Sequence, residues 1–165
     1  MLIQYWPTQY TVFTNRFGTD PAYYKRYGLP GHEGLDVRVQ TRAAVSPIYS
    51  CTEGQITFIG YRTLKDPYGY QVRVQTEYQG REYEFLYAHL ADQSCDLIAG
   101  SLVHPGTIIG TGGATGNARG AHLHVSICKV GATRNKETTY PSDLINPEPL
   151  FKEYIQFAGL EVEWL

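Results

Sequence analysis

The chain has 165 residues, a length that suits one compact domain. Hydrophobic residues make up 42% of the sequence, which is enough to form a core and excludes an intrinsically disordered chain. The formal net charge is −2 and no run of Lys or Arg occurs, so the sequence argues against nucleic acid as a partner.

The sequence also has no apolar run long enough to span a bilayer, which argues against a membrane partner. Residues 1–7 lack the basic and apolar regions of a secretory signal peptide. The cysteines, Cys51, Cys95 and Cys128, form no C-x-x-C pair, so a thiolate zinc site is not expected. We expect buried free thiols, and a single Cys51–Cys95 bridge is the alternative.

The first predicted element is a short helix over residues 21–27. Asp20 is a favourable N-cap residue, Pro21 suits the first helical position, and Gly28 is a typical stop.

The middle of the chain has the alternating pattern of β-strands. Val72 and Val74 alternate with polar neighbours, and after the Gln79-Gly80 turn signal the residues 82–89 alternate again, which predicts a hairpin. The strands follow one another with no room for crossover helices, so we expect an antiparallel sheet. Further short strands are expected at 35–40, 44–49, 54–61, 107–111 and 121–130.

The last predicted element is a helix over about residues 147–158. Asn146 and Pro147 repeat the signal of the first helix, and Gly159 is the expected stop. The polar segment 129–140 is interpreted as an excursion between the last strand and this helix. No linker or repeat separates the elements, so we expect residues 1–165 to form one domain, mainly β with short peripheral helices.

Four of the five histidines lie in three short segments, two of which contain glycines. These segments are Gly31–Asp36, Tyr87–Leu90 and Gly120–His124. The fifth histidine, His104, lies in a predicted loop and is expected to be a surface residue. Four clustered histidines with a carboxylate at ligand-like spacing indicate a metal site.

The third segment places two imidazoles on one face of a strand. Side chains alternate along a strand, so His122 and His124 point the same way while Leu123 points into the core. Catalytic zinc normally takes three protein ligands and leaves a position for water. His32 and Asp36 lie four residues apart around a glycine that lets the backbone bend, and they can supply the remaining ligands.

These motifs, in this order, resemble those of the lysostaphin and LytM type of zinc endopeptidase. The resemblance rests on H-x-x-x-D at His32 and Asp36, Tyr-Ala-His-Leu around His89, and Gly-x-His-Leu-His ending at His124. The glycine-rich stretch 110–117 also resembles the segment that precedes the family's His-x-His.

The resemblance covers about residues 10–150 and implies a fold, a cofactor and a substrate. The implied fold is the lysostaphin-type peptidase fold, an antiparallel β-domain similar to a barrel-sandwich hybrid with a loop-lined groove. The implied substrate is bacterial peptidoglycan, cut in a peptide stem or cross-bridge. The implied ligands of one zinc ion per chain are His32, Asp36 and His124. His89 and His122 match the catalytic positions that the family uses near the metal-bound water and the scissile carbonyl.

This chemistry fits the residue types that the chain contains. Zinc polarises a carbonyl and lowers the pKa of bound water toward ~7. A neutral imidazole can then move the proton from that water to the leaving amine. The general-base Glu of H-E-x-x-H enzymes is absent, because no His follows His32-Glu33 at the required spacing. We therefore expect Glu33 to be a solvated loop residue.

The chain departs from the family pattern on both sides of its His-x-His motif. Val125 and Ser126 stand where the family often has an aromatic or aliphatic residue and then Glu, and Ala118-Arg119 precede the last glycine. Arg119 is expected to be a solvated loop residue, with contact to a substrate carboxylate as the alternative. Three tyrosines are expected either to line a subsite or to pack at its rim: Tyr61, Tyr68 and Tyr70.

The leading hypothesis is a zinc endopeptidase of peptidoglycan, with two alternatives. A non-catalytic binding or regulatory module on the same fold is disfavoured, because every ligand position is filled. A structural phage-particle protein with a lytic domain is favoured by the missing signal peptide. We expect the protein to act at the bacterial cell wall, as a phage lysin, a virion-associated enzyme or a secreted enzyme whose leader was removed.

Overall fold

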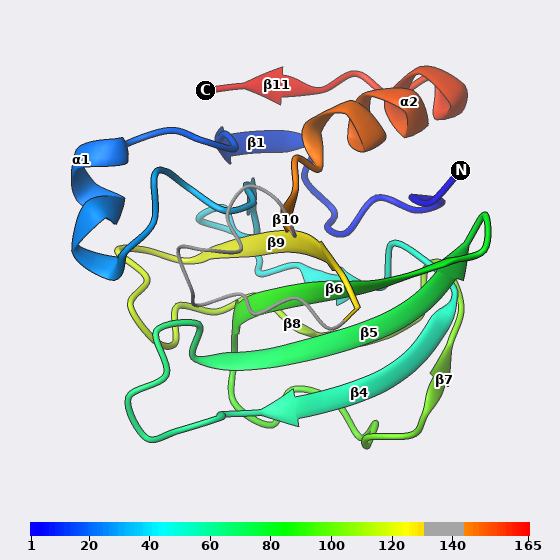
Figure 1. Cartoon of the computed structure of the whole chain (residues 1–165), viewed down its shortest axis with the longest axis horizontal. Coiled ribbons are helices and arrows are strands. Elements are labelled where there is room, and N and C mark those ends of the chain that lie inside the picture. The colour runs from blue at the N-terminus through cyan, green and yellow to red at the C-terminus, as the bar shows by residue number, and fades with distance from the viewer. Residues whose placement is uncertain (131–143) are drawn as a thin grey trace.

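The computed structural model describes residues 1–130 and 144–165, and its main feature is a nine-stranded sheet (Figure 1). The excursion predicted over 129–140 therefore lies almost wholly outside the described residues. Along the sheet the strands run in the order β11 (Glu163–Trp164), β1 (Val12–Asn15), β2 (Leu35–Arg38), β9 (His122–Lys129), β6 (Arg81–Leu90), β5 (Tyr70–Tyr78), β4 (Gly54–Gly60) and β7 (Leu102–Val103). β10 (Leu144–Ile145) pairs with β9, and β3 (Pro47–Tyr49) with β8 (Ile108–Thr111) forms a second sheet.

The strand directions confirm the predicted mainly antiparallel β-architecture. Among the described residues, every pair of named strands is antiparallel except β1 with β11, which pair in parallel at the edge of the sheet. The sheet is therefore mixed at that edge. The sequence analysis does not predict β1, β7, β10 or β11, of which the last three have only two residues each.

The longest strands form the predicted hairpin. β5 and β6 pair from Tyr78↔Arg81 back to Tyr70↔Leu90. The connecting residues Gln79 and Gly80 have φ of 52° and 72°. Two successive positive φ angles are the signature of a type I′ turn, whose twist matches that of the flanking strands.

The first helix has the predicted extent but not the predicted cap. α1 (Pro21–Tyr24) continues as the 3-10 turn η1 (Lys25–Tyr27) and ends at Gly28, which has φ 74°. Asp20 makes no side-chain cap hydrogen bond and has φ 51°. Its backbone carbonyl instead accepts from the N–H groups of Tyr23 and Tyr24, so Pro21 and this turn begin the helix without a side-chain cap.

The second helix agrees with the sequence signals at both ends. α2 (Glu148–Ala158) ends at Gly159, which has φ 64°. The Asn146 side-chain carbonyl accepts a hydrogen bond from the Glu148 N–H at 3.0 Å, which satisfies one of the free donors of the first turn. Figure 1 shows α2 and β11 beside β1, on one side of the curved layer of β4, β5 and β6.

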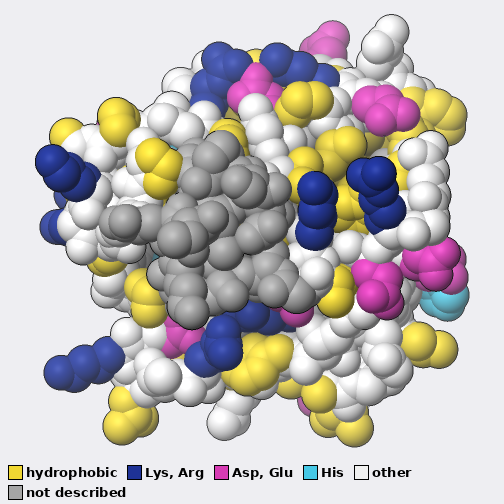
Figure 2. Space-filling view, in the orientation of Figure 1, with side chains coloured by type: hydrophobic (Ala, Val, Ile, Leu, Met, Phe, Trp, Pro, Cys, Tyr) yellow, Lys and Arg dark blue, Asp and Glu magenta, His cyan; other side chains and the backbone are white. Residues whose placement is uncertain are grey.

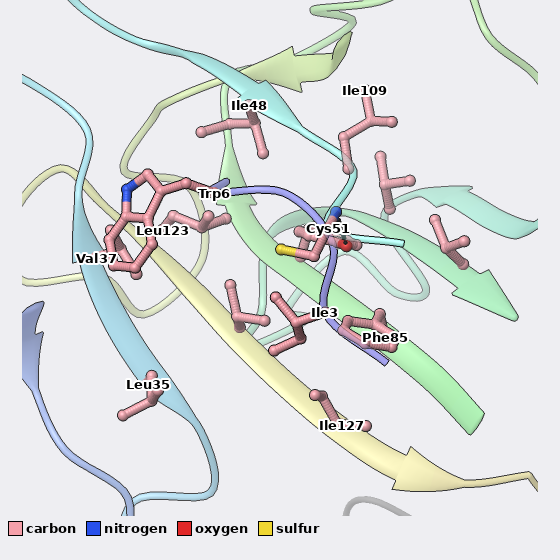
Figure 3. Close-up of a cluster of buried hydrophobic side chains, with 14 of the residues drawn as sticks. Ile3, Trp6, Leu35, Val37, Ile48, Cys51, Phe85, Ile109, Leu123 and Ile127 are labelled. Carbon is pink, nitrogen blue, oxygen red and sulfur yellow. Dashed lines mark hydrogen bonds between the residues drawn. The ribbon is translucent and has the colours of Figure 1, made fainter. Parts of the chain in front are cut away.

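The core lies under the concave sheet and collects residues from both termini (Figure 3). Leu35 and Val37 of β2 and Leu123 of β9 are at most 1% exposed, as the alternation predicts. Trp6 packs edge-to-face against Phe13 and Phe151, with ring centroids 5.1 and 5.6 Å away. All three cysteines are free, and the alternative Cys51–Cys95 bridge is therefore wrong.

The surface in Figure 2 carries acidic and basic side chains that are interspersed, without one large field of a single sign. Within residues 1–130 and 144–165, no helix is long and apolar enough to cross a membrane.

Candidate metal centre

Three neighbouring strands of the sheet place the candidate site residues side by side. Asp36 of β2 pairs directly with His124 of β9, and Ala88 of β6 pairs with His124 from the other side. Because Leu123 and Val125 enter the core, His122 and His124 lie on the opposite face of β9. His32 precedes β2; its N–H donates to the Thr19 carbonyl at 2.9 Å, and its C=O accepts from the Gly18 N–H at 2.7 Å.

The three predicted ligands converge on one point. His32 Nε2 lies 2.9 Å from His124 Nδ1 and 3.1 Å from Asp36 Oδ1, and His124 Nδ1 lies 3.0 Å from Asp36 Oδ1. Ligand atoms around a tetrahedral zinc with bonds of about 2.0–2.1 Å are separated by roughly 3.4 Å. A triangle of this size therefore suits one small divalent cation.

Hydrogen bonding alone does not account for this triangle. The Arg16 carbonyl accepts from His32 Nδ1–H at 3.0 Å, so a neutral His32 has its lone pair on Nε2. The contacts among His32 Nε2, His124 Nδ1 and Asp36 Oδ1 would then share a single proton. His124 Nε2 is buried without a hydrogen-bond partner among the described residues. A proton there leaves the Nδ1 lone pair for a cation, so the donor set fits a metal ion.

The local electrostatics favour the protonation states that metal binding needs at Asp36 and His124, whereas in the absence of a cation they favour a protonated His32. Burial opposes ionisation of Asp36, but the charge of His32 and hydrogen bonds from both histidines hold its pKa well below the ordinary value. Burial is the main cause that lowers the pKa of His124 to about 4. For His32 the charge and hydrogen bond of Asp36 outweigh burial, and its pKa is raised. An ionised carboxylate and a neutral imidazole are the forms that bind metal.

The two remaining histidines flank this triad. His89 Nδ1–H donates to the Thr115 carbonyl and His122 Nδ1–H to the Gly120 carbonyl, both at 2.8 Å, so each ring has its lone pair on Nε2. The His122 Nε2 atom lies 3.7 Å from Asp36 Oδ1. The ring centroids of His89 and His122 are 4.7 Å apart. Burial, and then the charges of neighbouring histidines, lower the pKa of His89 to about 3.

His89 also has an unusual backbone conformation. Its φ is 63°, in the left-handed region that few residues other than glycine adopt. Its N–H bonds to the Tyr68 carbonyl at 2.8 Å. Strain of this kind is concentrated at functional sites, where surrounding contacts hold the residue in place.

Two cavities meet at the triad. The larger, of about 650 Å³, runs past His32, Asp36, His122 and Arg119. The smaller, of about 230 Å³, lies between the α1–η1 segment and Tyr68. They share the lining residues Tyr23, Tyr24, His89, Asn117 and His124. An extended peptide lying across both cavities would pass the candidate metal centre.

The structure brings all five predicted site residues together and leaves His104 exposed, outside this cluster. The expectation of a solvated Glu33 is wrong, because this residue is only 2% exposed and lines the smaller cavity. The backbone of the preceding residue, His32, is hydrogen-bonded to residues 18 and 19, and this holds the loop that carries Glu33 against the protein.

Of the three tyrosines expected either to line a subsite or to pack at its rim, one lines a cavity and two do not. Tyr68 lines the smaller cavity, whereas Tyr61 and Tyr70 pack edge-to-face against each other, 5.5 Å apart, outside both linings. The Arg119 guanidinium lies 4.4 Å from the ring centroid of Tyr23 and lines the larger cavity. It is therefore placed where a substrate would pass.

Sequence reasoning missed the aromatic wall and the carbonyls that orient the imidazoles. Tyr23, Tyr24 and Tyr27 line the smaller cavity, and their clustering in one short helix was the available signal. Nothing local identifies the carbonyls of Arg16 and Thr115 as histidine partners, because each lies 16 or more residues away from its histidine.

Comparison with known proteins gives a consistent picture. The family described as Peptidase family M23 matches residues 30–137. The structure is similar to the antimicrobial peptidase lysostaphin from Staphylococcus simulans, with a TM-score of 0.63 and 23% identity over 87% of this chain and 50% of that chain. It is also similar to Csd3 from Helicobacter pylori, with a TM-score of 0.60 and 28% identity over 90% of this chain and 33% of that chain. The similarity to LytU has a TM-score of 0.60 and 27% identity over 86% of this chain and 84% of that chain. The chain thus spans half the length of that lysostaphin chain. No curated protein matches the chain significantly.

Proposed function

The chain belongs to peptidase family M23, and on that premise we propose that it is a zinc-dependent endopeptidase that hydrolyses peptide bonds of bacterial peptidoglycan. The observation that carries the proposal is the triangle of His32 Nε2, Asp36 Oδ1 and His124 Nδ1, with edges of 2.9–3.1 Å. The family accounts for peptide hydrolysis. The metal and the wall substrate are the parts that we propose.

His32, Asp36 and His124 would hold the zinc ion. When bound, zinc would act as a Lewis acid toward the scissile carbonyl and make water a nucleophile at neutral pH. Asp36 supplies a negative charge, and the two imidazoles each supply a nitrogen lone pair. Each of the three residues is at most 8% exposed. Such a buried site strengthens electrostatic interactions because water does not screen them.

His89 is the proposed proton carrier. Its Nδ1–H donates to Thr115, so Nε2 can take a proton from the attacking water and pass it to the leaving amine. His122 lies beside it, with Nε2 directed toward Asp36. Once protonated, that atom can donate to the carbonyl oxygen as negative charge develops on it. Both rings are held by backbone carbonyls, so neither needs to reorient during the reaction.

The substrate proposal rests on the shape of the site and on the sequence resemblance to lysostaphin-type enzymes. The two cavities form a groove that suits an extended peptide and offers no enclosed chamber for a small molecule. We place the activity at the bacterial cell wall, the only location of that polymer.

The test is digestion of purified walls of several chemotypes, with mass analysis of the released peptides. We expect new amine termini, bound zinc at one per chain, and loss of both in the variants His32→Ala, Asp36→Ala and His124→Ala. His104→Ala is the matched control, because this histidine is exposed and outside the cluster. Full activity after complete chelation would sink the zinc mechanism. Wall binding without new termini, at full zinc occupancy, would favour a binding module.

A further inference from the structure

Asp66 has a buried carboxylate in a loop that is otherwise mostly exposed. This loop covers residues 61–69 and joins β4 to β5. Residues 61–65 are exposed, whereas Asp66 is only 7% exposed. A charged side chain is seldom buried unless hydrogen bonds compensate for the loss of water. The proposed hydrolysis assigns no part to this residue, and Asp66 lines neither cavity.

The Asp66 carboxylate accepts hydrogen bonds from both backbone and side-chain donors. Oδ1 accepts from the Tyr68 N–H at 3.0 Å, and Oδ2 accepts from the Arg62 N–H at 3.0 Å. Oδ2 also accepts from the side-chain amide of Gln71 at 2.8 Å. The oxygen of that amide accepts from Arg73 Nε–H at 2.9 Å. The carboxylate therefore fastens the loop to buried side chains of β5 and fixes the backbone at Tyr68.

The backbone at Tyr68 in turn holds His89, the proposed proton carrier. The Tyr68 carbonyl accepts from the His89 N–H at 2.8 Å. His89 has φ 63°, and a residue stays in this region only when surrounding contacts hold it there. Asp66 thus bonds to the N–H of the residue whose carbonyl bonds to His89.

The same loop also contacts the segment that orients the His89 ring. His89 Nδ1–H donates to the Thr115 carbonyl at 2.8 Å. Thr115 Oγ1 accepts from the Tyr70 N–H at 2.9 Å, directly after the loop. The Pro67 carbonyl accepts from the Asn117 N–H at 2.9 Å. The acceptor of the His89 backbone N–H lies in the loop, and the acceptor of its ring lies in a segment bonded to that loop.

We propose that Asp66 is a positioning residue for His89: its carboxylate fixes the loop at Tyr68, and this loop sets the place of the imidazole that moves the proton. The proposal rests on the proposed peptidase function and adds to that site a residue that does not contact the substrate. Misplacement of a reacting group by about 1 Å can cost about 100-fold in rate. Asp66 can therefore control turnover from outside the groove.

The variant Asp66→Asn separates hydrogen bonding from packing, because it keeps the size of the side chain. One carboxylate oxygen becomes an NH2 group, which cannot accept from an N–H donor. Depending on the orientation of the amide, the lost acceptor is that of Tyr68 or that shared by Arg62 and Gln71. In both orientations the loop loses part of its attachment.

The first measurement is amide hydrogen exchange of the zinc-loaded protein by NMR, which needs no substrate. In Asp66→Asn the His89 amide should exchange at least about tenfold faster, because its acceptor is no longer fixed. The Val74 amide, in the middle of β5, should change by less than about twofold. The exposed Asp96→Asn is the matched control and should leave both rates unchanged. An unchanged His89 rate in folded Asp66→Asn would overturn the proposal.

The second measurement tests whether Asp66 acts through His89. Asp66→Asn should lower kcat on a wall-derived peptide about tenfold, with zinc still at one per chain. In the His89→Ala background the same substitution should change kcat by less than about twofold, because the group that it positions is absent. An equal loss in both backgrounds would contradict the proposal, since a general structural defect does not depend on His89.

Gln71→Met provides the test if Asp66→Asn does not fold. It keeps most of the side-chain volume and removes only the Gln71 donor from the carboxylate, so His89 exchange should rise about threefold. An unchanged His89 rate in Gln71→Met would then overturn the proposal.

The positioning role and the proposed function fail separately. If no peptide is cleaved but His89 exchange responds to Asp66→Asn, the proposed function fails and the hold of Asp66 on His89 stands. If walls are cleaved and neither exchange nor kcat responds, the positioning role fails and the proposed function stands.

Discussion

At the scale of single residues, the site depends on which imidazole nitrogen carries the proton. His32, His89 and His122 each donate Nδ1–H to a backbone carbonyl, and each therefore has its lone pair on Nε2. His124 is the exception, because its Nδ1 faces the triad. Backbone carbonyls are suitable partners because they accept only, and they fix the tautomer without adding charge.

The first prediction concerns His89 as the proton carrier. His89→Ala should retain one zinc per chain and lower kcat by at least ~100-fold, because general acid–base transfer contributes about that much or more. Zinc content by atomic absorption and steady-state kinetics on a wall-derived peptide give the two values. Loss of zinc together with activity would mean that His89 belongs to the ligand set instead.

The second prediction concerns Gly34, which lies between the proposed ligands His32 and Asp36. A Cβ on Gly34 would lie 2.3 Å from the Val125 carbonyl oxygen and 2.8 Å from His124 Cε1. Gly34→Ala should therefore push β2 away from β9, lower the free energy of unfolding by about 2 kcal/mol and weaken zinc binding. Gly120→Ala is the control for chemical denaturation, because a Cβ there meets nothing within 4 Å. Equal stability of the two variants would contradict the prediction.

At the scale of elements, the C-terminal segment braces Arg16, the residue whose carbonyl orients His32. The Arg16 side chain bonds to Glu148 of α2, and its guanidinium lies 4.9 Å from the Trp164 ring centroid of β11. The Arg16 carbonyl is the acceptor for His32. Both α2 and β11 lie outside the residues that match the family, 30–137. These elements, which lie outside the matched residues, therefore help to hold the proposed ligand His32 in place.

The third prediction concerns the pH dependence of this contact. Hydrogen bonding to Arg16 is the main cause that lowers the pKa of Glu148 in the folded protein. A lowered pKa stabilises the fold above the ordinary carboxyl pKa of about 4.3, and this contribution is lost as pH falls through the folded pKa. Glu148→Gln should therefore have a lower Tm at pH 7, and the difference from the parent protein should shrink below about pH 4. Thermal melts at several pH values measure it, with the exposed Glu153→Gln on the same helix as control. A difference that is independent of pH would contradict the ion-pair explanation.

At the scale of the whole molecule, the candidate metal centre joins parts of the chain that are distant in sequence. It links β2 and the loop before it to strand β9. Asp36 and His124, which meet there, are 88 residues apart in the sequence. A cation that binds only the folded state stabilises it, because the unfolded chain holds no preformed site. Metal binding should therefore act on global stability as well as on catalysis.

The fourth prediction follows from that linkage. Zinc at a free concentration of about 100 times its Kd should add about 2.7 kcal/mol to the free energy of unfolding. For a chain of this size that corresponds to a rise in Tm of about 5–10 °C. Circular dichroism melts with and without chelator measure the shift, and His124→Ala should show none. A zinc-dependent shift of equal size in His124→Ala would place the metal elsewhere.

Much of the fold could be predicted from the sequence, because the pattern that carries it is local. The β5–β6 hairpin followed from alternation and the Gln79-Gly80 turn, and the faces of β9 followed from His122, Leu123 and His124. The order of the motifs identified the family, which the match over 30–137 bears out. The turn and each single motif lie within about ten residues, and the order of the motifs can be read directly along the chain.

The tertiary structure alone decided the burial of Glu33, the parallel pairing of β1 with β11, and the partners of each imidazole. These features depend on contacts between segments that are far apart in the chain, and no local pattern encodes which segments will meet. The residue types at 32, 36 and 124 were sufficient to suggest a metal. The separation of about 3 Å between their ligand atoms is visible only in the folded chain. The sequence provides the residue types, but the pairing of β2 with β9 sets the distance between their side chains.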